Sequence, residues 1–408
     1  FRGAGRPEAA AAIERSVDLF AAEAGLSPEA VRRKNLLPAF NETHTNVFGA
    51  AYDCGDFPAA LEMVLEASGY DELRVEQQRR RDAGERKVLG LGLASYVEIT
   101  AIDFSGAGVS EYGRVELQPD GSVIAWTGST PHGQGHETAW AMIIADQLGV
   151  PFDAVTVKFG DTDIVPTRNV TGGSRSAQVA GSAMVSASTY LVTSAMEHAA
   201  TALEASVDDM IFDKAAGTFH VAGTPARSVS WAEVAVTAAA PLEGISDFVQ
   251  QASTFPFGAH CSVVEVDLDT GGVTILRHVC VDDCGTILNP MLADGQVHGG
   301  VASGIAQALI EEVVFDSQGT PMTSNFTDYG IISPTELPSF ERVPMVTPTP
   351  LNPLGAKGIG ESGTIGSTPA VQNAVVDAVS HLGIRHIDMP CTAQRVWRAI
   401  DAAERGAA

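Results

Sequence analysis

Four glycine-rich segments, each leading into a stretch that favours a helix, constrain this chain more than any other feature. They are Gly133-Gln134-Gly135-His136, Thr171-Gly172-Gly173-Ser174-Arg175-Ser176, Cys284 to Gln296, and Gly355 to Gly363. Such loops leave backbone N–H groups free at a helix start, where the helix dipole also favours negative charge. If the loops converge, they can hold a large, polar, phosphorylated cofactor along its length. For any single loop, a tight turn without a ligand is the simpler interpretation.

The side chains of these loops suit the same kind of ligand. They are cationic or polar and uncharged: Gln134, His136, Ser174, Arg175, Ser176, Asn289, Gln296 and Lys357. Glu361, in the fourth loop, stands among glycines and small residues. It is either a surface residue or, if it is buried beside a cofactor, a general base whose pKa is moved toward neutrality by burial.

Two common motifs near these loops fail the test of their context. The run from Gly358 to Gly363 matches the dinucleotide-binding pattern, but a proline-rich stretch precedes it where a buried strand is required. His132 and His136 have the spacing of zinc ligands, but the glycines around them indicate a loop and not the helix of such a site. We therefore favour neither a nicotinamide dehydrogenase nor a zinc enzyme.

Composition limits the class of protein and of partner. The 408 residues suggest two to three domains, and 45% hydrophobic against 18% charged residues describe a well-buried globular chain. A net charge of −25 repels nucleic acid and anionic lipid, and no apolar run approaches the ~20 residues of a membrane span. The five cysteines are scattered, without a CxxC pair, which argues against disulfides and favours a reducing cytoplasm.

The order of helical and strand patterns predicts an α+β fold. We expect helices over residues 7–24 and 28–35, followed by a charge-rich, solvated helix and linker over 71–87. The first helix has apolar residues at the spacing of one face, Ile13, Val17 and Phe20. The composition changes near residue 87, which predicts two domains, 1–87 and 88–408.

A recurring unit indicates an internal duplication. A hairpin over 115–128 is followed by a glycine loop and a helix over 138–148, and a hairpin over 264–282 by a loop and a helix over 297–313. We expect two further helices, over 176–205 and 369–382, each after a glycine loop. Residues 206–245 are predicted to form a short hairpin and a capped helical turn.

Taken together and in order, the loops resemble those of a known family. The motifs are His132 to Thr138, Gly173 to Ser176, Asp283 to Thr286 with Asn289-Pro290, Gly295 to Val297, and Gly355 to Glu361; Phe1 to Pro7 resembles an active-site loop. They resemble the molybdopterin-binding large subunit of the molybdenum hydroxylases (xanthine oxidase, carbon monoxide dehydrogenase and aldehyde oxidase). The resemblance spans nearly the whole chain but only the C-terminal half of that subunit. It implies elongated molybdenum-binding domains: the rest of the first over 1–87 and the second over 88–408.

The resemblance also implies a cofactor and a site. The cofactor would be a molybdopterin, in its cytosine dinucleotide form, whose molybdenum is held through the pterin dithiolene without a direct protein ligand. Glu361 would be the catalytic base and Arg2 a substrate-binding residue. The implied cofactor-binding residues are Gly133, Gln134, Gly135, His136, Thr138, Gly173, Ser174, Arg175, Ser176, Cys284, Asn289, Gln296, Lys357, Gly358 and Gly360.

By resemblance, the activity is the hydroxylation of an aldehyde or N-heteroaromatic C–H with water as the oxygen source. Carbon monoxide dehydrogenases have a cysteine where this chain has Gly3, which argues against oxidation of carbon monoxide. No cysteine cluster suits an iron–sulfur centre, so electrons would leave through partners: an iron–sulfur small subunit with [2Fe-2S] clusters and a flavin subunit with FAD.

The chain starts at Phe1 without an initiator methionine. We expect it to be a cleaved or separately encoded piece, with a second chain that supplies the N-terminal half of the large subunit. A different class of function stays open: a non-catalytic assembly half that binds no cofactor when it is isolated.

Overall fold

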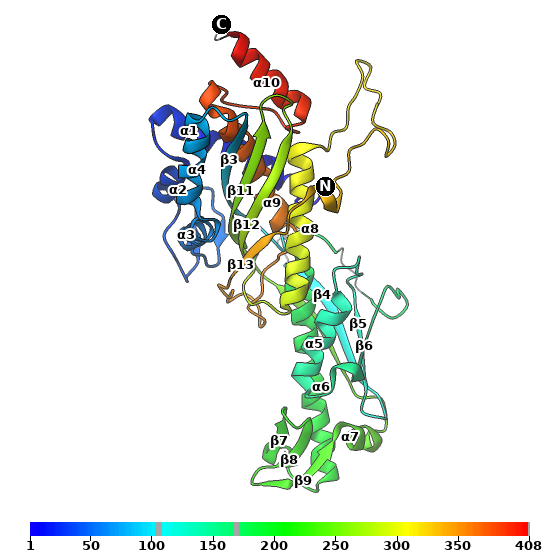
Figure 1. Ribbon diagram of the computed structural model, residues 1–408. Coiled ribbons are helices and arrows are strands. Elements are labelled where there is room, and N and C mark those ends of the chain that lie inside the picture. Colours follow the sequence, from blue (N-terminus) through cyan, green and yellow to red (C-terminus); the bar gives the residue numbers. More distant parts are fainter. Residues whose placement is uncertain (103–107, 167–170, 407–408) are drawn as a thin grey trace.

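Two lobes, each built on a four-stranded sheet, form an elongated molecule (Figure 1). The computed structural model describes residues 1–102, 108–166 and 171–406. The sheet of the first lobe has the strand order β3–β11–β12–β13, with the bounds Lys87–Val97, Phe257–Asp267, Val273–Asp283 and Glu341–Met345. The fold is the mixed α+β arrangement that the sequence predicts. No helix of the described part of the chain is both long and apolar enough to cross a membrane.

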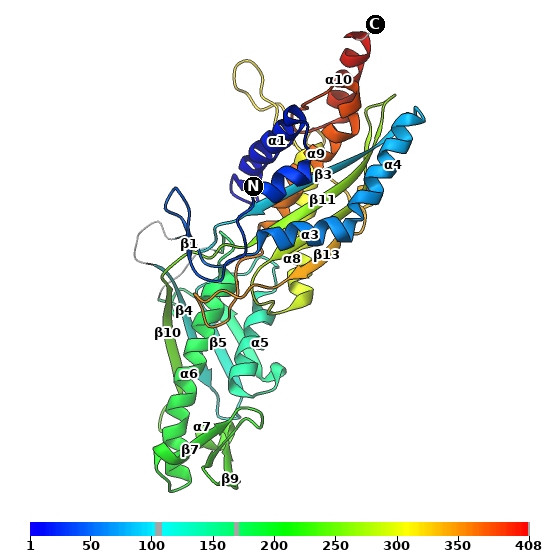
Figure 2. The ribbon, with the colours of Figure 1, turned by 90° about the vertical axis from the view of Figure 1, so that its left-hand side faces the viewer.

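Helices cover both faces of the first sheet (Figure 2). On one face lie α8 (Pro290–Leu309) and α9 (Ser362–Val379), whose valines and alanines pack on Val264, Val266 and Cys280. On the other lie α3 (Phe57–Ser68) and α4 (Tyr70–Asp82). The outer elements of this lobe are α1 (Arg6–Ala24), α2 (Pro28–Asn35), the pair β1 (His44–Thr45) and β2 (Ala51–Tyr52), and α10 (Ala393–Gly406). The buried valines and leucines of both faces make this sheet the centre of the lobe.

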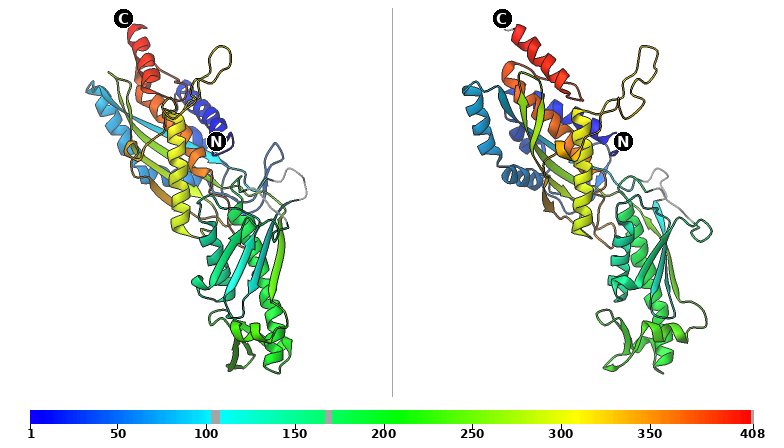
Figure 3. Two further views of the ribbon diagram at one scale, coloured as in Figure 1. Left: turned by 90° about the vertical axis from the view of Figure 1, so that its right-hand side faces the viewer. Right: turned by 45° about the vertical axis from the view of Figure 1, so that its right-hand side comes forward.

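The second lobe has the strand order β10–β4–β5–β6. Its strands are Glu243–Gln250, Val109–Leu117, Val123–Thr127 and Val155–Phe159, and α5 (His136–Leu148) and α6 (Ser176–Ala202) pack on them. At the far tip of the molecule lie β7 (Met210–Asp213), β8 (Thr218–Val221), β9 (Thr224–Ser230) and α7 (Trp231–Thr237) (Figure 3). The predicted hairpin and capped turn are therefore a three-stranded sheet and a helix, with Ser230 and Glu233 forming a capping box.

The recurring unit predicted from sequence is present in both lobes. In each, an antiparallel hairpin is followed by a helix and then by a strand parallel to the second strand of the hairpin: β4–β5–α5–β6 and β11–β12–α8–β13. A fourth strand pairs antiparallel with the first, β10 on β4 and β3 on β11. In both lobes the helix of the unit begins at a glycine loop, so the two units present similar helix starts.

The predicted apolar face of α1 is not its buried face. Ile13 and Phe20 are 62% and 59% exposed, whereas Glu14 and Arg15 are buried. The guanidinium of Arg32, itself buried, bonds Glu14 Oε2 and Asp18 Oδ1. Burial of a charged group requires such partners. This ionic cluster orients α1 against the lobe, and helical spacing alone could not reveal it.

Two helix starts lie earlier than predicted. Helix α8 starts at Pro290, where Asn289 caps it by accepting from the N–H of Leu292, and not at 297. Helix α9 starts at Ser362 and continues through Pro369, which the sequence analysis took as its first turn. The predicted spans of α1, α2, α5 and α6 agree with the structure within about two to three residues. Residue 87 is the first residue of β3, and the domain division there stays a prediction.

The first turns of α9 cross α8 closely. A side-chain carbon at Gly304 would lie 2.0 Å from Ser367 Oγ, and one at Gly300 would lie 3.0 Å from the Cα of Gly363. Only glycine at these positions allows the two backbones to approach so closely. The crossing holds the start of α9, and thereby Glu361, next to α8.

We predict that Gly304→Ala destabilises the protein, because its methyl group has no space in the crossing. Overpacking of this kind costs about 1–3 kcal/mol of unfolding free energy. Gly295→Ala, on the same helix with no atom near the new methyl, should instead stabilise the helix by about 0.5–1 kcal/mol. Denaturant unfolding of both variants checks this, and equal effects would contradict it.

Candidate functional site

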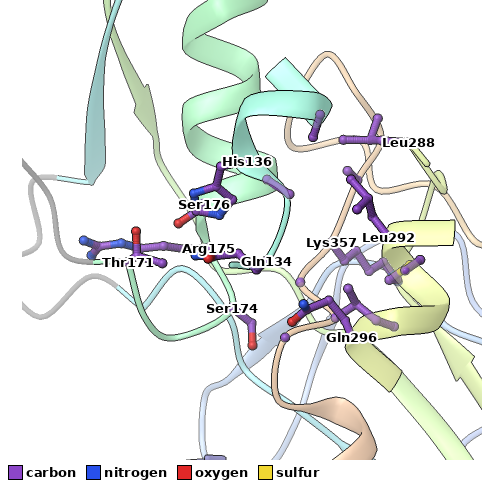
Figure 4. A pocket seen from close by; sticks show the side chains of 18 of the residues that line it. Gln134, His136, Thr171, Ser174, Arg175, Ser176, Leu288, Leu292, Gln296 and Lys357 are labelled. Carbon is purple, nitrogen blue, oxygen red and sulfur yellow. The ribbon is translucent and has the colours of Figure 1, made fainter. Parts of the chain in front are cut away.

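A cavity of about 590 Å³ lies where the glycine loops of the two lobes meet (Figure 4). It is lined by all four loops and by the N-terminal loop. Of the residues predicted from sequence, Gly135 and Thr138 do not line it. The others do: Arg2, Gly133, Gln134, His136, Gly173, Ser174, Arg175, Ser176, Cys284, Asn289, Gln296, Lys357, Gly358, Gly360 and Glu361. The loops therefore converge, as the sequence analysis expected.

Helix starts surround the cavity. Among the described residues, no side chain caps the first turns of α5, α6 and α9, whereas Asn289 caps α8. Uncapped N–H groups at a helix start are free to bind an anion. Three helix dipoles thus favour negative charge in one place.

Two buried polar atoms in the cavity wall point to a missing ligand. His136 Nδ1 and Ser176 Oγ have no hydrogen-bond partner within the described residues. Burial lowers the pKa of His136 to about 4, so its imidazole is neutral at pH 7. A buried polar atom without a partner is costly, and a polar ligand would satisfy both. These residues fit an extended, phosphorylated cofactor.

The second and fourth loops touch directly. A side-chain carbon at Gly358 would lie 2.2 Å from the carbonyl oxygen of Ser174, so only glycine fits there. Ser174 itself has a φ of +50°, in the left-handed region that non-glycine residues rarely adopt. This contact joins the loop before α6 in one lobe to the loop before α9 in the other.

Lys357 does not direct its charge into the cavity. Its ammonium lies 3.5 Å from Asp283 Oδ1 and donates to the carbonyl of Cys54 at 3.3 Å, and both charged side chains are fully buried. Asp283 needs this cation, because burial raises the pKa of its carboxyl. The prediction that Lys357 binds the cofactor therefore gains no support from the position of its ammonium.

Three other side chains of the cavity wall are also affected by their protein surroundings. Gln134 accepts from the backbone N–H of His132. Burial raises the pKa of the Cys284 thiol to about 12, so it is a neutral thiol and not a thiolate. Burial lowers the pKa of Arg175. These three residues line the cavity, and their contact with a cofactor stays a prediction.

Arg2 links two loops from the edge of the cavity. Its Nε donates to the carbonyl of Gly360, and its Nη2 donates to the backbone and side-chain oxygens of Gln296 at 2.9 and 3.0 Å. Most of its fork of donors is therefore used within the protein. A role in substrate binding stays a prediction for this residue.

Glu361 is held by donors on three sides. Its Oε1 accepts from the N–H of Gly3 at 3.0 Å; its Oε2 accepts from Ser174 Oγ at 3.1 Å and lies 3.6 Å from Arg6 Nη1. Its side chain is 13% exposed. A partly buried carboxylate in a cavity, with a fixed orientation, has the properties of a general base.

Glu98 is a residue that the sequence analysis missed. It follows β3, is fully buried, and contacts Ser174 and Ser362. Burial raises the pKa of its carboxyl to about 8. The sequence does show an acidic residue directly after an apolar strand, which could have drawn attention to Glu98. Only the fold shows that Glu98 lies near Glu361.

Models of two molybdopterin cofactor-binding domains match this chain, over residues 63–338 and 1–36. The chain is 36% identical to the carbon monoxide dehydrogenase large chain of Hydrogenophaga pseudoflava, over 96% of this chain and 51% of that one. It is 33% identical to the nicotine 6-hydroxylase large subunit of Paenarthrobacter nicotinovorans, over 98% of this chain and 50% of that one. The chain thus spans about half the length of these relatives.

Solved structures agree with the sequence matches. Carbon monoxide dehydrogenase from Oligotropha carboxidovorans superposes with a TM-score of 0.91 at 34% identity, over 98% of this chain and 52% of that one. Quinoline 2-oxidoreductase from Pseudomonas putida 86 superposes with a TM-score of 0.85 at 32% identity, over 96% and 52%. This chain belongs to the family of molybdopterin-binding subunits of molybdenum oxidoreductases that includes the carbon monoxide and xanthine dehydrogenases.

Proposed function

We propose that this chain provides the catalytic part of a molybdenum hydroxylase, which oxidises an aldehyde or N-heteroaromatic C–H with water as the oxygen source. The position of Glu361 carries this proposal. It lies in the wall of a cavity lined by uncapped helix starts, and donors hold its carboxylate on three sides.

Molybdopterin, in the cytosine dinucleotide form, is the cofactor that we propose for the cavity. Its phosphates suit the free N–H groups at the starts of α5 and α6, together with Ser176 Oγ and His136 Nδ1. Bound there, the cofactor supplies the two-electron redox chemistry and activates water.

Glu361 would accept the proton that the water-derived nucleophile loses. Arg6 at 3.6 Å and the N–H of Gly3 hold the carboxylate in a fixed position. Arg2 would keep the loop of Glu361 fixed against α8 through Gln296. Glu361 would thus accept the proton, and the other residues would hold it in position. The redox step belongs to the cofactor.

Carbon monoxide is not the substrate that we propose, although some relatives oxidise it. Gly3 has a φ of +103°, and a side-chain carbon there would lie 2.5 Å from Cδ of Pro7. A cysteine at this position would therefore strain the loop that supports Glu361. The similarity to nicotine 6-hydroxylase and quinoline 2-oxidoreductase suits an N-heteroaromatic substrate.

We further propose that the active enzyme is a cytoplasmic complex. The relatives are about twice as long as this chain, so the active enzyme would also need the other half of the large subunit. An iron–sulfur subunit and a flavin subunit would accept the electrons. Metal and pterin analysis of the chain, purified alone and with these partners, separates this proposal from a non-catalytic half that binds no cofactor.

Glu361→Gln should lower kcat by about 10²–10⁴-fold, because the amide cannot accept the proton. The molybdenum content should stay at the wild-type value, since the variant keeps the size of the side chain. Glu137→Gln, on α5 and outside the cavity, is the control and should keep full turnover. Full turnover of Glu361→Gln at normal molybdenum content would disprove the assignment.

Ser176→Ala and Gln134→Ala should each lower the amount of pterin retained after dialysis. For Ser176 the loss of a hydrogen bond to a charged group corresponds to about tenfold or more in affinity. Gln118→Ala, just after β4 and outside the cavity, should leave pterin content unchanged. Equal pterin in all three variants would argue against a cofactor held by these loops.

A further inference from the structure

The hydroxyl of Ser174 lies between two carboxyl groups. Its Oγ is 2.7 Å from Glu98 Oε1 and 3.1 Å from Glu361 Oε2. A hydroxyl has one proton and can donate to only one of them. If both glutamates were ionised, the second contact would join two oxygen atoms with no proton between them. A proton on one of the two carboxyl groups gives each contact its own hydrogen.

The surroundings of the two groups decide which one carries it. Glu361 accepts from the N–H of Gly3 and lies 3.6 Å from Arg6 Nη1, so a donor and a cation already face its carboxyl group. Glu98 is fully buried, and its second oxygen accepts from Ser362 Oγ at 3.0 Å. Within the described residues no cation lies within ion-pair distance of Glu98.

Charged groups farther away do not change which of the two carboxyl groups carries the proton. Glu361 disfavours a second negative charge on Glu98, and Arg6 and Arg2 oppose that effect. Burial is the largest influence and raises the pKa of Glu98 to about 8. When two carboxyl groups lie close together in a buried site, the negative charge of one disfavours the ionisation of the other.

Ser174 cannot easily turn away from this arrangement. Gly358 touches its carbonyl oxygen, which also accepts from Gln178 Nε2 at 3.1 Å. Its left-handed backbone conformation is typical of a residue that the surrounding structure holds in place.

We propose that Glu98 is a positioning residue for Glu361: a neutral carboxylic acid that donates to Ser174, so that Ser174 donates its own proton to the Glu361 carboxylate. The protonation of Glu98 is argued from these contacts and from its burial, and it does not depend on the proposed function. Its effect on turnover rests on the proposed function of Glu361. Ionisation of Glu98 would remove the donor behind Ser174 and place a second negative charge beside the base, so activity should fall above about pH 8.

Infrared spectroscopy of the complex, purified with its partner chains, tests the protonation directly. At pH 7 the difference between wild type and Glu98→Gln should contain the C=O stretch of a protonated carboxylic acid, and this band should disappear around pH 8. Glu111→Gln removes a different buried glutamate that bonds a serine, and it must leave the Glu98 band in place. A difference spectrum without the acid band would overturn the proposal.

Ser362→Ala keeps the test valid if Glu98→Gln does not assemble. It removes the donor to the second oxygen of Glu98, so the band should move to higher frequency and persist. A band that does not move belongs to another carboxyl group and would overturn the assignment.

The pH profile of kcat tests the positioning role. Glu98→Gln keeps a neutral donor, so it should keep activity at pH 7 and lose the alkaline decline near pH 8. Glu98→Ala has no donor and should lose about 10–100-fold, the worth of a hydrogen bond that supports a charge. An acid band together with a wild-type profile in Glu98→Gln would overturn the role of Glu98. A normal band with full turnover in Glu361→Gln would instead disprove the function of Glu361.

Discussion

The contact between Gly358 and the carbonyl of Ser174 is the constraint on which the site depends. It brings the loop before α9 against the loop before α6, although the two helices belong to different lobes. Ser174 Oγ then reaches both Glu98 and Glu361. The close crossing of α8 and α9 adds the third loop, and the cavity is the space that these contacts leave between the helix starts.

Charge is distributed unevenly in this region. Lys357 and Asp283 form a buried ion pair. Arg32 pairs in the same way with Glu14 and Asp18 of α1. The cavity itself retains uncapped N–H groups, a neutral histidine and hydroxyl groups. Such a wall attracts phosphate through dipoles and hydrogen bonds, and Arg2 and Arg175 are cationic side chains that also line it. The overall charge of −25 therefore does not prevent the chain from holding an anionic cofactor.

Local patterns in the sequence predicted the loops and most helices, because glycine turns and apolar periodicity are local properties. The predicted start of α9 was wrong, because Pro369 lies inside this helix and not in its first turn. The part of α9 before Pro369 packs on Gly300 and Gly304 of α8. The direction of Lys357 and the role of Glu98 depend on residues far away in sequence, Asp283 for one and Ser174 for the other. Such partners become visible only once the lobes are packed together.

We propose that the four loops bind one molybdopterin along the cavity, and a crystal structure of the complete, cofactor-loaded complex would show whether they do. We expect phosphate oxygens at the starts of α5 and α6, hydrogen-bonded to Ser176 Oγ, with the Glu361 carboxylate facing the metal. A cofactor bound elsewhere, or one whose phosphates leave Ser176 and His136 without partners, would contradict it.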